Sequence, residues 1–384
     1  MRTPQNTQPK VSNAPSLRFS EFKGEWEEST IGNEFDLYSG NTPSRLNKDH
    51  FKGSINWISS GELKEHYITE TKEKISKDAA KNLKLLPAGT LVIAIYGLEA
   101  DGVRGTCSVT MSESTISQAC MAFTTKGRIE NEFLYSWYKK HGNIIGLRYA
   151  QGTKQQNLSY DIIEKFKIAY PKPQEQQKLY KFIALLDERI ATQSRIIERL
   201  ETLIRGIRYN AFKDIQGKVF HLCDIADIYQ PQTISSSDLT TNGFPVYGAN
   251  GVIGKYKTYN HETAQICITC RGNTCGTVNY TQPKAWITGN SMVVNIDKHK
   301  NEVNKRYLYH YLSEYNFKTI ISGSGQPQIV RTPLERIRIT LPTIEKQAKV
   351  AHSMDLLLEK IGTEISVRSL LEKQKQYLLR QMFI

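Results

Sequence analysis

The sequence has few features of a secreted, membrane-spanning or disulfide-stabilised protein. Only six of its 384 residues are cysteine, and they lie scattered along the chain. No apolar run approaches the roughly 20 residues that a membrane span needs. Residues 1–16 are polar, with three prolines, and predict a disordered tail rather than a signal peptide. We therefore expect a cytoplasmic chain with free, buried thiols.

The sequence motifs of a DNA-modifying enzyme are also absent. There is no Gly-x-x-x-x-Gly-Lys-Ser/Thr phosphate loop, no Asn/Asp-Pro-Pro-aromatic segment for methyl transfer, and no carboxylate cluster with nuclease-like spacing. Cys267 and Cys270, with Cys275 nearby, lack the second ligand pair of a structural zinc site. The eight histidines show no metal spacing. The sequence therefore predicts no catalytic residue and no metal site.

Positive charge, in contrast, is abundant. Lysine and arginine number 51 against 38 acidic residues, which gives a formal net charge of +13. Such an excess favours a polyanionic partner, because neutralising phosphates releases counterions and yields affinity regardless of sequence. A merely basic soluble protein would have the same balance, so charge alone does not establish nucleic-acid binding.

The chain contains an internal repeat. The segment Gly152–Leu158 matches Gly323–Ile329 in the pattern Gly, small hydroxyl, any, Gln, any, amide, aliphatic. The register continues without a gap, and 11 of 39 positions are identical between 152–190 and 323–361. Helix composition alone cannot produce the Gly–Gln–amide loop. The sequence therefore indicates a duplication.

The repeat extends upstream with a shifted offset. Residues 31–35 resemble 222–226, residues 42–44 resemble 233–235, and residues 116–119 resemble 287–290. The segments between these matches differ in length and composition. We therefore expect a common frame that carries two different surfaces.

Each half reads as a mixed α/β domain followed by a long helix. Short buried strands are expected at 91–96 and 265–270, and short helices at 131–142 and 305–315. Prolines at 171, 173 and 342 suit the starts of the long helices. The predicted fold class is α/β (α+β), two copies, joined by two long antiparallel coiled-coil helices with pseudo-twofold symmetry. The expected boundaries are a tail at 1–16, domains at 17–170 and 214–341, and helices at 171–213 and 342–384.

Apolar residues in the two helices recur in alternating steps of four and three, the period of a coiled-coil seam. A polar residue stands near the middle of each seam, Gln193 in the first and Glu364 in the second. In an antiparallel pair these two would meet, and a polar contact within an apolar seam fixes register at some cost in stability. The predicted seam residues are Leu179, Ile183, Leu186, Ile190, Gln193, Ile197, Leu200, Val350, Met354, Leu357, Ile361 and Glu364.

This organisation resembles the specificity (S) subunit of type I restriction–modification systems. The resemblance covers Leu17 to Ile384. It rests on Trp57–Leu63, on Pro245–Gly254, and on the Gly152–Leu158 loop with Pro171-x-x-x-Glu175-Gln176-Gln177-Lys178 at the start of the first long helix. In the second copy, Glu345-Lys346-Gln347 departs from the usual order of that helix start.

The resemblance implies a non-catalytic subunit that recognises a bipartite double-stranded DNA target. Each target recognition domain would read one half, and the helices would fix the unread spacer. Two modification subunits would bring S-adenosylmethionine, and restriction/translocase subunits would bring ATP and Mg²⁺, so that this chain holds no cofactor. Two alternatives remain open: a stand-alone regulator that binds a bipartite operator, and a fused enzyme with cryptic catalytic residues.

Base reading in the major groove needs amide and guanidinium side chains, whereas phosphate contacts set register. Two such domains on one face of DNA would place their half-sites about 10 base pairs apart, centre to centre. The glutamine shared by the two loops could instead have a structural role, as could both loop glycines. The predicted DNA-binding residues are Arg45, Ser59, Ser60, Tyr96, Arg104, Lys154, Gln155, Gln156, Asn157, Tyr247, Asn250, Arg271, Asn273, Thr274, Asn290, Gln326 and Gln328.

Overall fold

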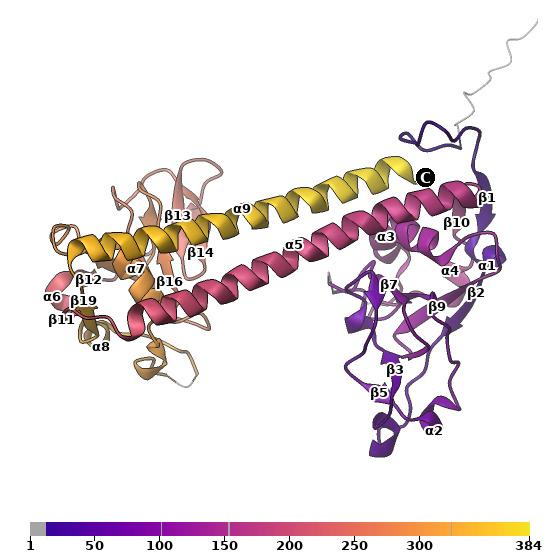
Figure 1. Ribbon diagram of the computed structural model, residues 1–384, viewed down its shortest axis with the longest axis horizontal. Coiled ribbons are helices and arrows are strands. Elements are labelled where there is room, and N and C mark those ends of the chain that lie inside the picture. The colour runs from indigo at the N-terminus through magenta and orange to yellow at the C-terminus, as the bar shows by residue number, and fades with distance from the viewer. Residues whose placement is uncertain (1–12, 101, 153, 324) are drawn as a thin grey trace, which may run out of the picture. The chain divides into compact units, whose positions relative to one another are not determined.

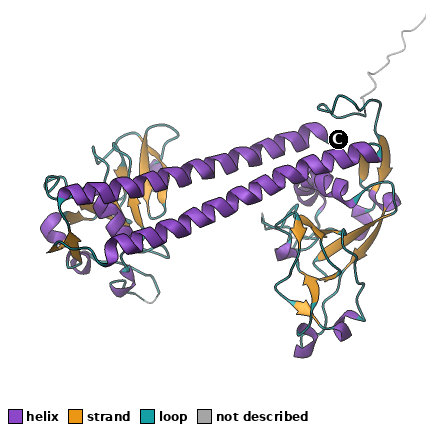
Figure 2. Cartoon of the chain, viewed as in Figure 1, coloured by secondary structure: helices purple, strands orange, loops and turns teal. Residues whose placement is uncertain are grey.

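The computed structural model describes residues 13–100, 102–152, 154–323 and 325–384 (Figure 1). Residues 1–12 of the predicted tail, and Thr153 and Ser324 of the repeated loop, lie outside the described residues. The chain divides into two compact units, one formed by 1–194 with 367–384 and the other by 195–366. Each unit combines strands with helices, as predicted (Figure 2). Among the described helices, none is long and apolar enough to cross a membrane.

The first unit contains a five-stranded sheet, a three-stranded sheet and a separate strand pair. The five-stranded sheet has the order β2 (Phe35–Ser39), β9 (Cys120–Thr125), β6 (Leu91–Ala94), β7 (Cys107–Thr110), β4 (Tyr67–Ile68). The three-stranded sheet has the order β5 (Lys74–Ile75), β3 (Ile55–Ile58), β8 (Ser114–Ile116). Its helices are α1 (Ile31–Glu34), α2 (Lys77–Ala80), α3 (Asn131–Tyr149) and α4 (Tyr160–Ile163), with 3-10 turns at Lys48–Phe51 and Ser60–Glu62.

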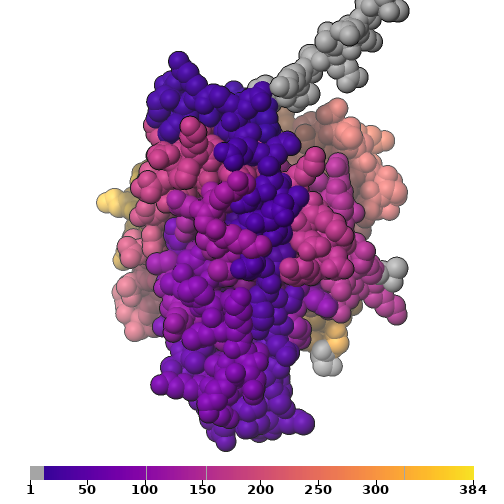
Figure 3. Space-filling view, turned by 90° about the vertical axis from the view of Figure 1, so that its right-hand side faces the viewer, coloured from indigo at the N-terminus to yellow at the C-terminus, as the bar shows by residue number. Residues whose placement is uncertain are grey.

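The strand pair joins the N-terminal segment to the segment that precedes the first long helix. Strand β1 (Glu27–Thr30) pairs antiparallel with β10 (Lys167–Tyr170). On the face of the first unit in Figure 3, the indigo surface of the N-terminal segment accordingly lies beside a magenta surface. Asn13 exchanges two hydrogen bonds with the backbone of Trp26, so residue 13 of the predicted tail is bound to the domain.

The second unit repeats this plan with fewer strands. Its four-stranded sheet has the order β12 (Asp227–Tyr229), β18 (Ser291–Asn295), β15 (Ile266–Thr269), β16 (Val278–Tyr280). Its three-stranded sheet has the order β14 (Gly251–Tyr256), β13 (Phe244–Gly248), β17 (Trp286–Ile287), and β11 (Lys218–His221) pairs with β19 (Arg338–Leu341). Its helices are α6 (Leu222–Ile225), α7 (Lys305–Glu314) and α8 (Arg331–Glu335), with 3-10 turns at Ser236–Asp238 and Phe317–Thr319.

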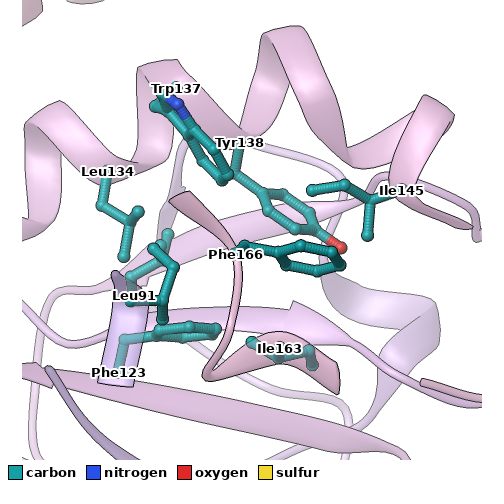
Figure 4. A pocket seen from close by; sticks show the side chains of 9 residues that line it. Leu91, Phe123, Leu134, Trp137, Tyr138, Ile145, Ile163 and Phe166 are labelled. Carbon is teal, nitrogen blue, oxygen red and sulfur yellow. The ribbon is translucent and has the colours of Figure 1, made fainter. Parts of the chain in front are cut away.

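The core of the first unit lies between its sheet and the aromatic face of α3. Tyr138 of α3 and Phe166 line a small apolar pocket there, which also receives Leu91 and Phe123 from the sheet (Figure 4). Helix α3 continues past the predicted end at Gly142. A Cβ at that glycine would lie 2.6 Å from the Tyr138 ring, so the glycine provides space for the ring rather than ending the helix.

The two long helices are α5 (Pro173–Lys213) and α9 (Ile344–Met382). In the first unit, Leu179 and Ile183 near the start of α5 share a core with Leu379 and Met382 at the end of α9. In the second unit, Phe212 at the end of α5 shares a core with Ala351 near the start of α9. The predicted antiparallel direction of the helices is therefore confirmed.

A buried glutamine attaches each long helix to the domain that precedes it. Gln176, fully buried, donates to the carbonyls of Arg128 and Pro171, both at 2.9 Å, and accepts from the N–H of Glu130 at 3.0 Å. Gln347 donates to the carbonyls of Glu302 and Pro342 and accepts from the N–H of Asn304. Each amide thus satisfies backbone groups both at its own helix start and ahead of α3 or α7.

On each long helix, an aspartate that follows the buried glutamine forms a second attachment to the same domain. Asp187 of α5 forms an ion pair with the buried Lys375 of α9, and its Oδ2 lies 3.4 Å from the Tyr135 hydroxyl of α3. In the second unit, Asp355 of α9 accepts hydrogen bonds from His310 at 2.8 Å and Arg306 at 2.9 Å, both in α7. Burial lowers the pKa of His310 to about 4, so its imidazole donates to Asp355 while neutral at pH 7.

We predict that Gln176→Ala and Gln347→Ala each lower the free energy of unfolding by about 2–4 kcal/mol, because each leaves buried backbone groups without partners. Chemical denaturation of the full chain measures the change. The matched controls are Gln174→Ala and Gln374→Ala, exposed positions on the same two helices, which should cost less than about 0.5 kcal/mol. Equal losses in the control and test variants would contradict this role.

Candidate nucleic-acid interface

In the first unit, several connections meet at one edge of the two sheets. The N–H of Ile95, after β6, bonds to the carbonyl of Ala119, before β9. The N–H of Ser117, after β8, bonds to the carbonyl of Ile58 at the end of β3, and Asn41, after β2, bonds to Ile116. We call this edge the first rim: residues 40–42, 59–61, 96–98, 117–119 and 154–157.

The second unit has the same hydrogen bonds at the corresponding edge. The N–H of Cys270 bonds to the carbonyl of Asn290, and the N–H of Thr288 bonds to the carbonyl of Tyr247. The second rim therefore comprises residues 230–233, 248–250, 271–273, 288–290 and 325–328. Because short polar loops on a rigid scaffold are where binding residues usually lie, these rims are the candidate DNA-binding surfaces.

The bonds also show which residues of the two rims correspond. The parallel pair of β3 and β8 aligns Ile58 with Ile116, and the parallel pair of β13 and β17 aligns Tyr247 with Ile287. Residues 57–60 of the first domain thus occupy the place of residues 246–249 in the second. The Trp57–Leu63 and Pro245–Gly254 segments, which resemble two alternative forms of one stretch, therefore overlap in the common fold, with Trp57 at the place of Val246.

The described residues of the repeated Gly–Gln loop form the same backbone hydrogen bonds in both units. Gln151 and Asn157 exchange two backbone hydrogen bonds, as do Ser322 and Gln328. Leu158 bonds to the carbonyl of Ile95, just as Ile329 bonds to that of Cys270. The loops therefore join each rim to the strand at the centre of its main sheet.

A glycine makes this turn possible in each loop. Gly152 has φ +109° and Gly323 has φ +89°, a region that other residues rarely adopt. A Cβ would lie 2.1 Å from the Gln155 carbonyl oxygen in the first loop and 2.5 Å from that of Gln326 in the second. These distances support the structural role that the shared sequence indicated for both glycines.

Most of the predicted first-domain residues lie on the first rim. Ser59 and Ser60 follow β3, and Tyr96 forms an isolated bridge with Asn157. Arg104 donates to the carbonyl oxygens of Leu98 and Glu99, and so supports the loop after β6. Lys154 and Gln155 are exposed, and Gln156 and Asn157 are half-buried.

Arg45 lies beside the first rim rather than on it. Both of its terminal nitrogens bond to Glu73 at 2.8 Å, and its guanidinium lies 4.5 Å from the Phe51 ring centre. This hydrogen bond lowers the pKa of Glu73 and raises that of Arg45. A DNA contact by Arg45 would have to share or break this bidentate pair.

Most of the predicted second-domain residues lie on the second rim, and Thr274 directly follows it. Arg271 bridges to Gln328, and the backbone of Asn290 binds that of Cys270. Tyr247 differs, because it is buried and its hydroxyl accepts a hydrogen bond from the Gln282 N–H. Its side chain therefore packs beneath the rim. Asn250, Arg271, Asn273, Asn290, Gln326 and Gln328 are exposed, and Thr274 is half-buried.

The predicted seam residues are all buried or half-buried. Leu179, Ile183, Leu186, Gln193, Ile197 and Met354 are buried, while Ile190, Leu200, Val350, Leu357, Ile361 and Glu364 are half-buried. At the end of α9 the buried positions are Leu371, Lys375, Leu379 and Met382. Cys267 and Cys270 lie in different clusters, and no group of three His, Cys, Asp or Glu suited to a metal occurs among the described residues.

Several exposed polar residues of the rims were not predicted, among them Asn41, Gln230, Gln232 and Thr233. Gln118 is another such residue. Its hydrogen-bonded neighbour Thr42 was noted only as part of the repeat. A signal for Gln118 is present in the repeat, because residues 116–119 align with 287–290 and each of these segments contains one carboxamide. The carboxamides stand at neighbouring rather than equivalent positions, so Asn290 does not point to Gln118 directly.

Two α/β units, each with a polar rim and a share of two antiparallel helices, define a modular DNA-recognition protein. A family model described as "Type I restriction modification DNA specificity domain" matches residues 23–202 and 216–373. The chain belongs to this family. It is accordingly a sequence-specific DNA-recognition subunit of the non-catalytic kind, and the stand-alone regulator is not favoured.

Individual relatives agree with this assignment. The chain is 23% identical over 353 residues to the EcoprrI specificity subunit of Escherichia coli, covering 84% of each chain. It is 25% identical over 198 residues to the MjaIX specificity subunit of Methanocaldococcus jannaschii, covering 50% of this chain and 45% of that one. The S subunit from M. genitalium shares the fold, with TM-score 0.66 and 18% identity over 97% of this chain and 99% of that one.

We predict that Gly323→Ala lowers the free energy of unfolding by about 1–3 kcal/mol, since it places a Cβ against a carbonyl at positive φ. Gly325→Ala, two residues on, is the matched control, because a Cβ there meets nothing within 4 Å. Thermal or chemical denaturation compares the two. If Gly325→Ala were as destabilising as Gly323→Ala, the loop geometry would not be the cause.

Proposed function

We propose that this chain reads a bipartite DNA target, with the first rim on one half and the second rim on the other. The observation that supports this most is the combination of shared hydrogen bonds and different side chains at the two rims. At the position after β6 or β15, for example, the first rim carries Tyr96 and the second carries Arg271. A shared backbone arrangement that carries two different sets of side chains is suited to reading two different half-sites.

The exposed amides and guanidinium groups of the rims would read bases in the major groove, where paired hydrogen bonds distinguish them. Lys154 and the backbone N–H groups of the loops would bind phosphate and set the register. The two long helices would act as a ruler for the unread spacer, with half-sites about 10 base pairs apart, centre to centre. The contact of Gln193 with Glu364, which would fix the register of that ruler, stays a prediction.

The surfaces of the long helices support docking of two equivalent partners. Leu185 of α5 and Leu356 of α9 are exposed by 64% and 52%, and they occupy the same position in the repeat. Ile196 and Val367 also correspond, and are exposed by 38% and 37%. Apolar side chains kept at the same exposed positions in two diverged copies suggest one partner bound twice.

These partners would be two modification subunits carrying S-adenosylmethionine, joined by restriction/translocase subunits that use ATP and Mg²⁺. A solved structure with the same fold, with TM-score 0.57 and 15% identity over 93% of this chain and 97% of that one, concerns complex assembly of the type I R-M system. This chain would direct the assembly to its site, in the cytoplasm where host defence requires it.

We predict that Leu185→Glu and Leu356→Glu each remove one of two bound modification subunits, and that the double variant removes both. A carboxylate at the centre of an apolar contact would have to be buried without a partner. Size-exclusion chromatography with light scattering measures the stoichiometry. Leu46→Glu, at a position 97% exposed in the recognition domain, is the control and should leave the complex intact. Unchanged stoichiometry in the double variant would refute this docking site.

Methylome sequencing of a host that expresses this chain with its modification subunits tests the function. We expect one bipartite motif with a fixed gap. Exchange of residues 17–170 for another recognition domain should change one half of that motif and leave the other half and the gap as they were. The proposal fails if both halves change, or if the purified chain methylates DNA alone with S-adenosylmethionine.

A further inference from the structure

The turn before β9 in the first rim and the turn before β18 in the second rim occupy equivalent positions in the two domains. In the first, Ile95 bonds to the carbonyl of Ala119; in the second, Cys270 bonds to that of Asn290. Residues 117–119 therefore correspond one by one to 288–290. Each turn carries one exposed carboxamide beside one small residue, but in opposite order: Gln118 then Ala119 in the first, Gly289 then Asn290 in the second.

The structure explains why the second rim has no side chain at the place of Gln118. A Cβ on Gly289 would lie 2.5 Å from the Thr233 Oγ1 and 2.9 Å from the Pro231 carbonyl oxygen. The segment after β12 thus lies against this glycine. In the second rim, the carboxamide of this turn has to come from the next residue, Asn290.

In the first rim the segment after β2 leaves room and supplies a hydrogen bond instead. Thr42, the counterpart of Thr233, donates its hydroxyl to the Oε1 of Gln118. Because this bond uses one lone pair of the amide oxygen, it holds the amide plane in one orientation. The second lone pair and the NH₂ group remain available, and no hydrogen-bond partner of that nitrogen is found among the described residues.

We propose that Gln118 is a specificity-determining residue of the first rim and reads an adenine in the first half-site, with Thr42 positioning its amide. An amide reads adenine by accepting from N6–H and donating to N7, which requires both of its ends in one plane. Because the Thr42 hydroxyl uses only one of the two lone pairs of that oxygen, the oxygen can still accept from N6–H. The inference rests on the proposed function, and assigns a base type to one rim position.

The test uses the full chain in complex with its modification subunits, and a panel of duplexes in which each base pair of the half-sites is replaced in turn. Wild type should prefer A·T at one position of the first half-site by about 5- to 150-fold, the range for one bidentate contact. Gln118→Ala should bring that preference close to onefold and leave every other position unchanged. Thr42→Val should reduce the preference at the same position only.

Gln174→Ala, an exposed glutamine on α5, is the matched control and should bind the whole panel like wild type. The inference is overturned if Gln118→Ala keeps the wild-type preference at every position, or if it weakens binding equally to all duplexes, as a phosphate contact would. Failure of the proposed function has a different signature, since wild type itself would then show no bipartite preference.

Discussion

The attachment of each long helix to its recognition domain depends on one buried amide. Gln176 and Gln347 each bind two carbonyls and one N–H of the backbone, and these groups belong both to the helix start and to the segment before α3 or α7. A glutamine can do this because it is both donor and acceptor and carries no charge to desolvate. An apolar residue of similar size would leave three backbone groups unpaired.

This attachment matters for recognition because a rim can read bases only if its position on the helix is fixed. The aspartates Asp187 and Asp355 add a second point of contact in each unit, but with different sets of partners. Asp187 contacts a lysine and a tyrosine and lies 3.6 Å from His66, whereas Asp355 contacts an arginine and a histidine. The backbone-directed contacts are therefore the same in both units, whereas the contacts between side chains have diverged. In the same way, the two rims share their backbone hydrogen bonds and differ in their side chains.

Much of this arrangement could be predicted from the sequence, because the duplication presents most sequence patterns twice and each copy supports the assignment of the other. The strands at 91–94 and 266–269, the helices α5, α7 and α9 and the loop glycines lie within the predicted segments, whereas α3 extends to Tyr149, past its predicted end. The equivalence of Trp57–Ser60 with Val246–Ala249 could not be seen, since no residue is shared and only the parallel strand pairing aligns them. The burial of Tyr247 was missed because the order of strands in the sheet, which decides its surroundings, does not show in a local pattern.

We propose that the two rims, and not the long helices α5 and α9, contact the bases. Hydrogen–deuterium exchange of the full complex with and without its cognate duplex tests this directly. The account predicts slowed exchange on DNA binding in the first rim, residues 40–42, 59–61, 96–98, 117–119 and 154–157, and in the second rim, residues 230–233, 248–250, 271–273, 288–290 and 325–328. Protection confined to α5 and α9, or to one rim with a complete cognate site, would contradict it.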